Sequence, residues 1–225
     1  MKTTKNFYER YWLKDGKPIP EDDATSSDRK RLLKLSLELF LKKRNGNQKI
    51  LDAGCGSGEF VIYMKQLGFD VTGMDLAEGA IQIAKRIGAS THFVVGSAEE
   101  GLPFSSGQFD AIWNTEVIEH LFDIHATFSE FNRILRVGGI VILTTPFHGF
   151  LKNLAIAMIG FEKHYNPYLS HIRFFTKRTL TESLTRAGFQ PVFWRGIGRV
   201  WPVYKSLFVV AQKVKSPAPA PEIVG

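Results

Sequence analysis

The chain alternates between short, strongly apolar runs and longer segments in which apolar residues recur every three or four positions. The first pattern predicts buried strands, and the second predicts helices that pack on them. The predicted strands cover residues 49–53, 69–74, 91–95, 109–113, 140–145, 190–195 and 206–213. The predicted helices cover residues 58–67, 77–87, a stretch ending near 135, and 177–187. Strands that alternate with helices predict an α/β fold, with a parallel sheet covered on both faces.

Two patterns compete between residues 29 and 44. Leu33, Leu35, Leu37 and Leu39 alternate as in a strand, although Leu33 and Leu37 also share a helical face. Leu, Lys and Glu favour a helix, and Ser27 or Asp28 could cap it. We therefore predict a helix over residues 29–44.

We expect residues 1–215 to form a single domain. Residues 1–47 would supply an N-terminal cap and the helix just described. Residues 146–176 would form an insert at the acceptor site, before the last predicted helix. The Pro-rich tail, 216–225, has a composition typical of disorder.

Composition narrows the class of protein. A chain of 225 residues can bury one substantial core. It has no apolar run as long as a membrane span, no visible signal peptide and a single cysteine, which together favour a cytoplasmic protein. The net charge of +7 would suit nucleic acid, but the basic clusters lack the interleaved aromatic residues of a single-strand platform. These features argue against a nucleic-acid partner, and they leave the oligomeric state open.

The end of the first predicted strand carries the strongest functional signal. Gly54, Gly56 and Gly58 follow it with a G-x-G-x-G spacing, and Asp75 ends the next strand. Glycine allows a sharp turn and a close approach by a ligand, and a carboxylate at that place can accept hydrogen bonds from two ribose hydroxyls. A dinucleotide fold would have its third glycine at Glu59, and no Lys followed by Ser or Thr marks a triphosphate loop. The pattern indicates a nucleoside-containing ligand and argues against a nicotinamide oxidoreductase.

The run 51–58 together with Asp75 resembles the glycine loop of class I S-adenosylmethionine-dependent methyltransferases. The strand start at 107–110 and the turn at 135–139 also stand where that family has them. Within the family, the chain resembles the ubiquinone-biosynthesis O-methyltransferase-like group. The resemblance implies a Rossmann-like, doubly wound sheet of seven mostly parallel strands with an antiparallel edge strand. It also implies S-adenosyl-L-methionine as the cofactor.

The resemblance assigns cofactor contacts residue by residue. The set lies at the carboxyl ends of the predicted strands and consists of Asp52, Gly54, Cys55, Gly56, Gly58, Asp75, Leu76, Ser97, Ala98 and Asn114. Asp52 would take the ammonium group of the cofactor, Asp75 the ribose, and Leu76 one face of the adenine. Many relatives have Asp where this chain has Ser97, so the contact with the adenine edge would be weaker. Cys55 would only be a small side chain that fits the loop.

A second signal is the run Glu116-Val117-Ile118-Glu119-His120. On a helix, its two carboxylates and its imidazole would lie near one face. A similar E-x-x-E-H unit serves a divalent metal in ubiquinone-pathway O-methyltransferases and in small-RNA 3′-terminal 2′-O-methyltransferases, with a further histidine from the insert. The resemblance thus implies Glu116, Glu119, His120 and His171 as ligands of Mg²⁺ or Mn²⁺, with His148 and His164 as alternative imidazoles. The unit also occurs in metal-free methyltransferases, where His120 or Glu116 would be the catalytic, structural or substrate-binding group.

Two further segments could shape the site. Phe7, Tyr8, Tyr11 and Trp12 either close over the cofactor, as a similar segment does in relatives, or pack on the outside of the domain. The apolar stretch 150–161 is too short to span a bilayer. It could be a lid, a wall for a lipophilic acceptor, an in-plane contact with a membrane, or a helix packed on the core.

We therefore expect an enzyme that methylates an oxygen of a small, hydroxylated, lipophilic acceptor, with or without a divalent metal. RNA ribose 2′-O-methylation and a cofactor-binding protein without catalysis are the alternatives. The acceptor itself cannot be named from the sequence, because the resemblance is weakest in the insert and the termini.

Overall fold

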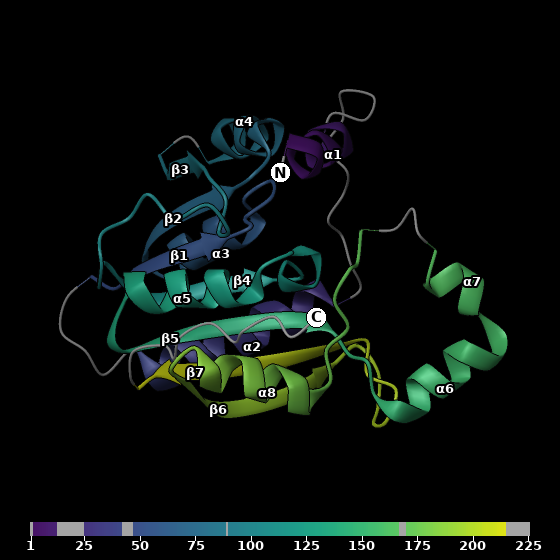
Figure 1. The fold of residues 1–225 in the computed structure, drawn as a ribbon. Helices are drawn as coiled ribbons and strands as arrows, with labels where there is room; N and C mark the ends of the chain where they lie inside the picture. Colours follow the sequence, from purple (N-terminus) through teal and green to yellow (C-terminus); the bar gives the residue numbers. More distant parts are fainter. Residues whose placement is uncertain (1, 13–24, 42–46, 89, 167–169, 215–225) are drawn as a thin grey trace.

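Seven strands form one sheet in the order β3-β2-β1-β4-β5-β7-β6 (Figure 1). This computed structural model describes residues 2–12, 25–41, 47–88, 90–166 and 170–214, so the tail predicted to be disordered lies outside the described residues. The strands are β1 (Lys49–Ala53), β2 (Asp70–Asp75), β3 (His92–Val95), β4 (Phe109–Thr115), β5 (Leu135–Pro146), β6 (Phe189–Ile197) and β7 (Ser206–Lys213). The sequence pattern thus located all seven strands.

The sheet is mostly parallel. Strands β1 to β5 pair in parallel, whereas β7 pairs antiparallel with both β5 and β6. The edge strand β6 is therefore joined to the sheet by an antiparallel ladder. This topology confirms the predicted Rossmann-like fold of class I methyltransferases, in which ligands bind beyond the carboxyl ends of the parallel strands.

Helices cover both faces of the sheet. They are α2 (Ser26–Phe40), α3 (Glu59–Gln66), α4 (Glu78–Ile87), α5 (Ile124–Ile134) and α8 (Lys177–Arg186). Leu33 of α2 and Val61 of α3 belong to one apolar core, while Phe131 of α5 and Leu180 of α8 belong to the core on the other face. Successive strand residues serve opposite cores because side chains alternate along a strand.

Two predicted boundaries are wrong. Helix α2 starts at Ser26, after Thr25, and not at a cap formed by Ser27 or Asp28, and it ends at Phe40. The segment that follows Trp113 is not a continuous helix. Strand β4 runs on to Thr115, because Asn114 and Thr115 pair with Leu143 and Thr144 of β5, and Glu116 then turns with a φ of 50°. Only a short 3₁₀ turn, η2 (Ile118–His120), precedes α5.

The insert between β5 and α8 holds two further helices, α6 (Phe150–Ile159) and α7 (Phe161–His164). Figure 1 shows them to one side of the sheet, beyond the end of β5. At the other end of the chain, α1 (Lys2–Trp12) lies beside α4. Among the described residues, no helix combines the length and apolar character needed to cross a membrane.

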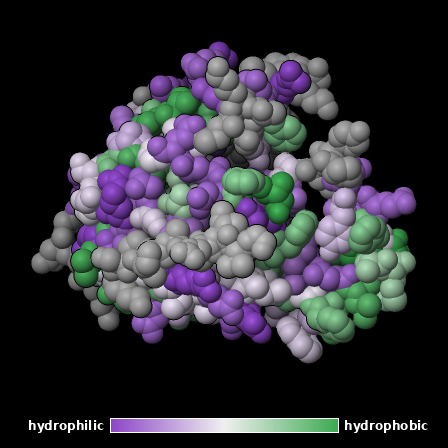
Figure 2. Space-filling view, viewed as in Figure 1, coloured by the Kyte–Doolittle hydropathy of each residue, from purple (hydrophilic) through white to green (hydrophobic). Residues whose placement is uncertain are grey.

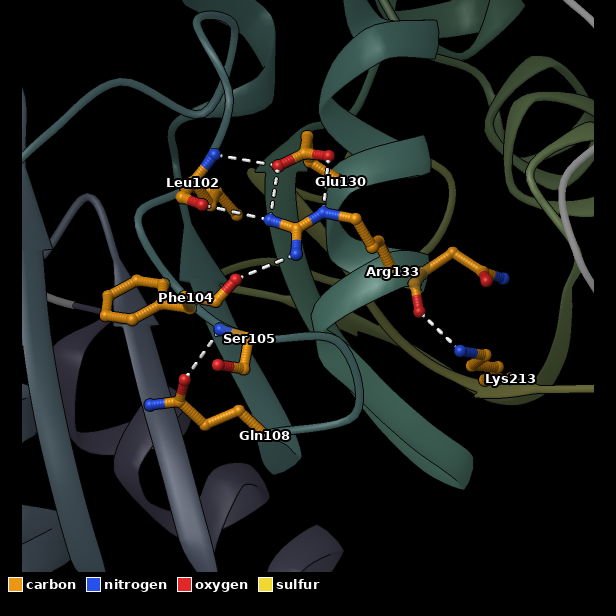
Figure 3. A network of polar contacts seen from close by, with 8 residues as sticks. Leu102, Phe104, Ser105, Gln108, Glu130, Arg133 and Lys213 are labelled. Atoms are coloured by element: carbon orange, nitrogen blue, oxygen red, sulfur yellow. Dashed lines mark hydrogen bonds and ion pairs between the residues drawn. The ribbon is translucent and has the colours of Figure 1, made fainter.

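A polar network holds the loop after β3 in place (Figure 3). Arg133 of α5 donates hydrogen bonds to the carbonyl oxygens of Phe104 at 2.7 Å and Leu102 at 2.9 Å. It also binds both carboxylate oxygens of Glu130, and these hydrogen bonds lower the pKa of that carboxyl. Glu130 in turn accepts the backbone N–H of Leu102 at 2.7 Å. Since the same loop begins with Ser97 and Ala98, the network fixes one wall of the predicted cofactor site.

Candidate functional site

A cavity of about 450 Å³ opens at the carboxyl ends of β1, β2 and β4. Its walls come from the glycine loop, the ends of the strands, α1, α2 and the segment that returns from the insert. Of the ten residues predicted to contact the cofactor, nine line it, namely Asp52, Gly54, Cys55, Gly56, Asp75, Leu76, Ser97, Ala98 and Asn114. Gly58 is not among the lining residues, because it lies at the end of the loop, where it is the N-cap of α3.

The glycine loop is tightly built. Gly54, Gly56 and Gly58 have φ values of 85°, 51° and 86°, a region that other residues rarely adopt. A Cβ added to Gly54 would lie 2.4 Å from Cγ2 of Val117, and one added to Gly58 would press on Ala84 and Phe93. The backbone N–H groups of Gly54 and Cys55 both donate to the carbonyl oxygen of Met74, at 2.7 and 2.9 Å. The loop is therefore anchored to the end of β2 and leaves its open side to the cavity.

Asp75 joins the glycine loop to α4. Its carboxylate accepts the N–H of Gly56 at 3.0 Å and the N–H of Ala77 at 2.9 Å. Burial nevertheless raises the pKa of Asp75 above its usual value. A partly buried carboxylate that faces a cavity is ready for further hydrogen-bond donors, and two ribose hydroxyls would supply them.

The remaining predicted contacts surround this carboxylate. Ser97 is buried, and its Oγ accepts the N–H of Glu99 at 3.2 Å, which leaves its hydroxyl hydrogen to donate. The amide of Asn114 donates to the carbonyl oxygen of Ala53 at 2.6 Å, while its buried Oδ1 has no hydrogen-bond partner among the described residues. A buried acceptor without a donor is costly, so an incoming N–H or O–H group would be stabilised there.

Helix α1 forms the roof of the cavity. The lining includes Phe7, Tyr8 and Trp12, and Trp12 is buried against Ala77 and Ala80. Glu9 accepts the N–H groups of Glu78 at 2.6 Å and Gly79 at 3.1 Å, so it caps the first turn of α4. The side chain of Tyr11 lies outside the described part of the structure. Of the two predicted positions for this segment, the structure shows the one over the cavity.

The side chains that line the cavity suit S-adenosylmethionine. The glycine loop and Asp75 line the cavity, and Asn114 Oδ1 can accept a hydrogen bond from a donor such as an ammonium group. Leu76 and Ala98 add apolar surface beside them. An amino acid, a ribose and an adenine could each find matching chemistry along this one cavity.

Glu119, His120 and His171 form a group of side chains, of which the two histidines line the cavity. Each offers one ligand atom, and the three atoms lie within 4.8 Å of one another. Backbone hydrogen bonds create this arrangement, because the N–H groups of Ile172 and Arg173 both donate to the carbonyl oxygen of Glu119 at 3.0 Å. The returning segment of the insert is thereby clamped to η2, and His171 lies with its ring centre 4.8 Å from that of His120.

Burial disfavours the charged forms of these side chains. It lowers the pKa of His120 to about 4 and raises the pKa of Glu119 well above its usual value, with the nearby Glu116 adding to the second effect. Nδ1 of His120 lies 3.0 Å from the carbonyl oxygen of Ser170, which can only accept. Nδ1 must therefore carry the hydrogen of the neutral ring, and Nε2 keeps a free lone pair. Oε1 of Glu119, 3.9 Å from that nitrogen, has no hydrogen-bond partner among the described residues.

Glu116 does not belong to the three-residue group. The prediction that placed it on a helical face with Glu119 and His120 is wrong, because Glu116 follows β4 in a left-handed turn. Its carboxylate instead lies 3.2 Å from the guanidinium of Arg29, a buried residue of α2. It still lines the cavity, together with Arg29, Ser26 and Phe60. The sequence offered no signal for those last three, since their position depends on how α2 and α3 pack.

Comparison with known proteins agrees with the fold. A family model described as "Methyltransferase domain" matches residues 26–192. The ubiquinone biosynthesis O-methyltransferase of Dinoroseobacter shibae is 33% identical over 156 residues, which cover 66% of this chain and 62% of that protein. The malonyl-[acyl-carrier protein] O-methyltransferase of Serratia marcescens is 32% identical over 124 residues, covering 54% and 48%. The matched part thus spans about half to less than two thirds of these curated relatives.

A solved structure shows the same fold. The 1,6-didemethyltoxoflavin-N1-methyltransferase of Burkholderia thailandensis superposes with a TM-score of 0.69 at 21% identity, over 95% of this chain and 88% of that one. At this identity, the similarity concerns the fold alone. Because the family model matches most of the chain, including the glycine loop, the protein belongs to the methyltransferase domain family.

Proposed function

We propose that this protein transfers the methyl group of S-adenosylmethionine to an oxygen atom of a small, hydroxylated, lipophilic acceptor. One observation carries the proposal. A single cavity joins a glycine loop and Asp75, suited to the cofactor, to His120, a neutral imidazole with a free nitrogen lone pair. The relatives named for the methylation of oxygen support the choice of acceptor atom.

The residues of this chain divide the work between binding and proton transfer. S-adenosylmethionine supplies an already activated sulfonium methyl, so the protein mainly needs to align the acceptor with it. Asp75 would hold the cofactor by its ribose, and Asp52 or Asn114, which both line the cavity, would hold its ammonium group. An acceptor hydroxyl must lose a proton as its oxygen takes the methyl group, and Nε2 of His120 would receive it.

Glu116 and His171 would complete the acceptor end of the cavity, with Glu119 beside His120. Glu119, whose pKa is raised by burial, lies close enough to Nε2 of His120 to help orient a hydroxyl between them. Glu116 is fixed by Arg29 and could receive a second polar group of the acceptor. The pocket between them is lined in part by Tyr8, whose ring centre lies 5.9 Å from that of His120.

The same side chains could hold a divalent cation. Glu119, His120 and His171 offer one carboxylate oxygen and two imidazole nitrogens, a set that suits Mn²⁺ or, less well, Mg²⁺. The free Oε1 of Glu119 and the free lone pair of His120 fit this role. Glu116, predicted as a fourth ligand, would have to leave Arg29 to join them. A bound cation would lower the pKa of an acceptor hydroxyl.

Cofactor binding should be measured first and turnover second. Isothermal calorimetry should show that S-adenosylhomocysteine binds and NAD does not. Labelled cofactor should then transfer its methyl group to members of a panel of alkyl-substituted phenols, with short-chain carboxylic acids and an RNA oligonucleotide as comparison acceptors. His120→Ala should lose turnover by about 100-fold, in the range of general acid–base catalysis, while S-adenosylhomocysteine affinity stays within error. Binding of S-adenosylhomocysteine without transfer to any acceptor would contradict the proposed activity.

Chelation separates the two versions of the mechanism. If a cation takes part, exhaustive EDTA treatment abolishes turnover, and Mn²⁺ or Mg²⁺ restores it. His171→Ala should then weaken Mn²⁺ binding measured by electron paramagnetic resonance, whereas His164→Ala should not. Full activity after chelation would leave His120 to act without a metal.

A further inference from the structure

We propose that the insert docks the protein on an anionic lipid bilayer, with α6, α7 and the loop between β6 and β7 as the contact surface. This inference extends the proposed function, because it names the lipid bilayer as the source of the lipophilic acceptor. The docking itself does not depend on methyl transfer.

Helix α6 is apolar but does not pack into a hydrophobic core. Lys152 is its single charged residue, and none of its ten residues is buried. Phe150, Met158 and Ile159 have 80%, 70% and 87% of their surface exposed. A helix that is apolar on all sides is normally covered on all sides. Exposed apolar surface of this kind marks a site of contact with another protein or a membrane.

The apolar surface continues beyond α6. Phe161 on α7 and Phe174 on the returning segment are exposed, as are Val200 and Trp201 in the loop between β6 and β7. That loop lies against the start of α6, because Lys152 Nζ is 3.3 Å from the carbonyl oxygens of both Tyr204 and Lys205. Figure 2 shows the apolar residues gathered over α6 and α7, away from the more polar body of the protein.

The charge around this surface favours an anionic occupant. Residues 150–166 and 198–205 contain four basic residues, Lys152, Lys163, Arg199 and Lys205, against one acidic residue, Glu162. The chain as a whole carries +7. Basic side chains beside exposed Phe and Trp are typical of segments that lie in the plane of a membrane interface.

The same charges argue against a second copy as the occupant. In a two-fold symmetric dimer the patch would face itself, so Lys163 and Arg199 would approach basic residues of the partner. Repulsion would then oppose the apolar contact. An anionic lipid surface satisfies both the apolar and the basic residues at once.

The position of the patch also fits delivery of an acceptor. The insert leaves the sheet at the end of β5 and returns through Ser170 and His171, which line the cavity. Phe174, on the patch, lies 4.8 Å ring to ring from His148, the first histidine of the insert. Along the chain, only the few residues from His171 to Phe174 therefore separate the acceptor end of the cavity from the proposed lipid contact.

Vesicle flotation with the full chain tests the proposal. The protein should float with phosphatidylcholine vesicles that contain phosphatidylglycerol, bind pure phosphatidylcholine far more weakly, and bind less as salt is added. Phe150→Ser combined with Ile159→Ser should weaken binding about tenfold or more. Val137→Ser combined with Ile87→Ser is the matched control, because both residues are exposed apolar side chains outside the patch. It should bind as the wild type does.

A charge swap provides a second, independent test. Lys163→Glu with Arg199→Glu should abolish the preference for anionic vesicles. Lys34→Glu with Lys85→Glu changes the net charge equally at exposed positions elsewhere and should keep that preference. Calorimetry with S-adenosylhomocysteine should give wild-type affinity for every variant, which keeps this test separate from that of the proposed function. The proposal is overturned if the wild type does not float, if patch and control variants bind alike, or if light scattering shows a dimer that Phe150→Ser with Ile159→Ser dissociates.

Discussion

At Gly54, one hydrogen atom in place of a methyl group allows the glycine loop to form. Gly54→Ala should lower the melting temperature and abolish S-adenosylhomocysteine binding, because the new Cβ would lie 2.4 Å from Val117 Cγ2 at a φ of 85°. Gly68→Ala is the matched control, since Gly68 has a φ of 91° and nothing within 4 Å of the added atom. The control should cost only the backbone strain, about 1–2 kcal/mol, and should still bind. Equal loss of stability in both variants, with binding retained, would show that the contact with Val117 is easily relieved.

Asp75 serves both the protein and, in our proposal, the cofactor. Asp75→Ala removes the acceptor for the N–H groups of Gly56 and Ala77 and for two ribose hydroxyls. Each hydrogen bond to a charged group is worth about 1.5–3 kcal/mol, so calorimetry should show an affinity loss of at least about 100-fold. Asp70→Ala, at the exposed start of the same strand, should bind normally. Unchanged affinity in Asp75→Ala would remove Asp75 from the site.

Some of the residues at the site could be predicted from the sequence, and others could not. The residues of the glycine loop and Asp75 were predictable because each belongs to a strand and the turn directly after it. Arg29, which lines the cavity, and Glu9, which caps α4, were not, since their positions depend on how α2 and α1 pack on other elements. Glu116 was misplaced because its spacing to His120 fits a helix, whereas the backbone there continues a strand that pairs with β5.

Among the elements, α1 is the one most able to control access to the cavity. Its side chains form the roof, and Glu9 holds it by capping the first turn of α4. Glu9→Gln removes the negative charge at that helix terminus and should weaken the cap by about 1 kcal/mol. Stopped-flow measurements should then show S-adenosylhomocysteine leaving about fivefold faster.

Glu100→Gln is the control for the roof helix, because Glu100 is exposed and does not line the cavity. Its release rate should match that of the wild type. If Glu9→Gln also releases the ligand at the wild-type rate, the cap does not limit exchange.

At the scale of elements, sequence reasoning succeeded where hydrophobic runs are continuous and failed at their ends. The strands were recognisable because both faces of a parallel sheet are buried, which requires nearly unbroken apolar runs. Strand β5 starts at Leu135, five residues earlier than predicted, because Leu135 pairs with Phe109 before a bulge. That pairing is a tertiary contact and leaves no periodic pattern in the sequence.

The whole molecule combines a conventional sheet with an insert that departs from it in burial and charge. The body buries its apolar residues in two cores on opposite faces of the sheet, whereas α6 buries none. The insert returns to the body through hydrogen bonds to the backbone oxygen of Glu119 and through a group of rings around His148. The connection between body and insert therefore includes imidazole side chains, and this part of it is sensitive to acid.

His148 should make the folded protein less stable as the pH falls. Burial lowers its pKa to about 4, with Asn153 opposing the shift and Lys152, His164 and His171 adding to it. In the unfolded chain its pKa returns to about 6.5. Between these two values the unfolded state binds a proton that the folded state does not, so stability is lost as the pH falls from about 6.5 to about 4. This group causes no change above or below that window. His120 contributes in the same direction and window.

Melting temperatures measured across this pH range test the effect. His148→Gln can keep a hydrogen bond to Asn153, which lies 3.2 Å from the imidazole, but it cannot titrate. The melting temperature of this variant should therefore fall less steeply between pH 6.5 and pH 4 than the melting temperature of the wild type does. The slope that remains is due to the other histidines. His92→Gln, at the exposed start of β3, should leave the slope unchanged. If His148→Gln loses stability with acid as steeply as the wild type does, His148 must be able to bind a proton without leaving its buried place, and the insert would then be held by contacts that do not depend on its charge.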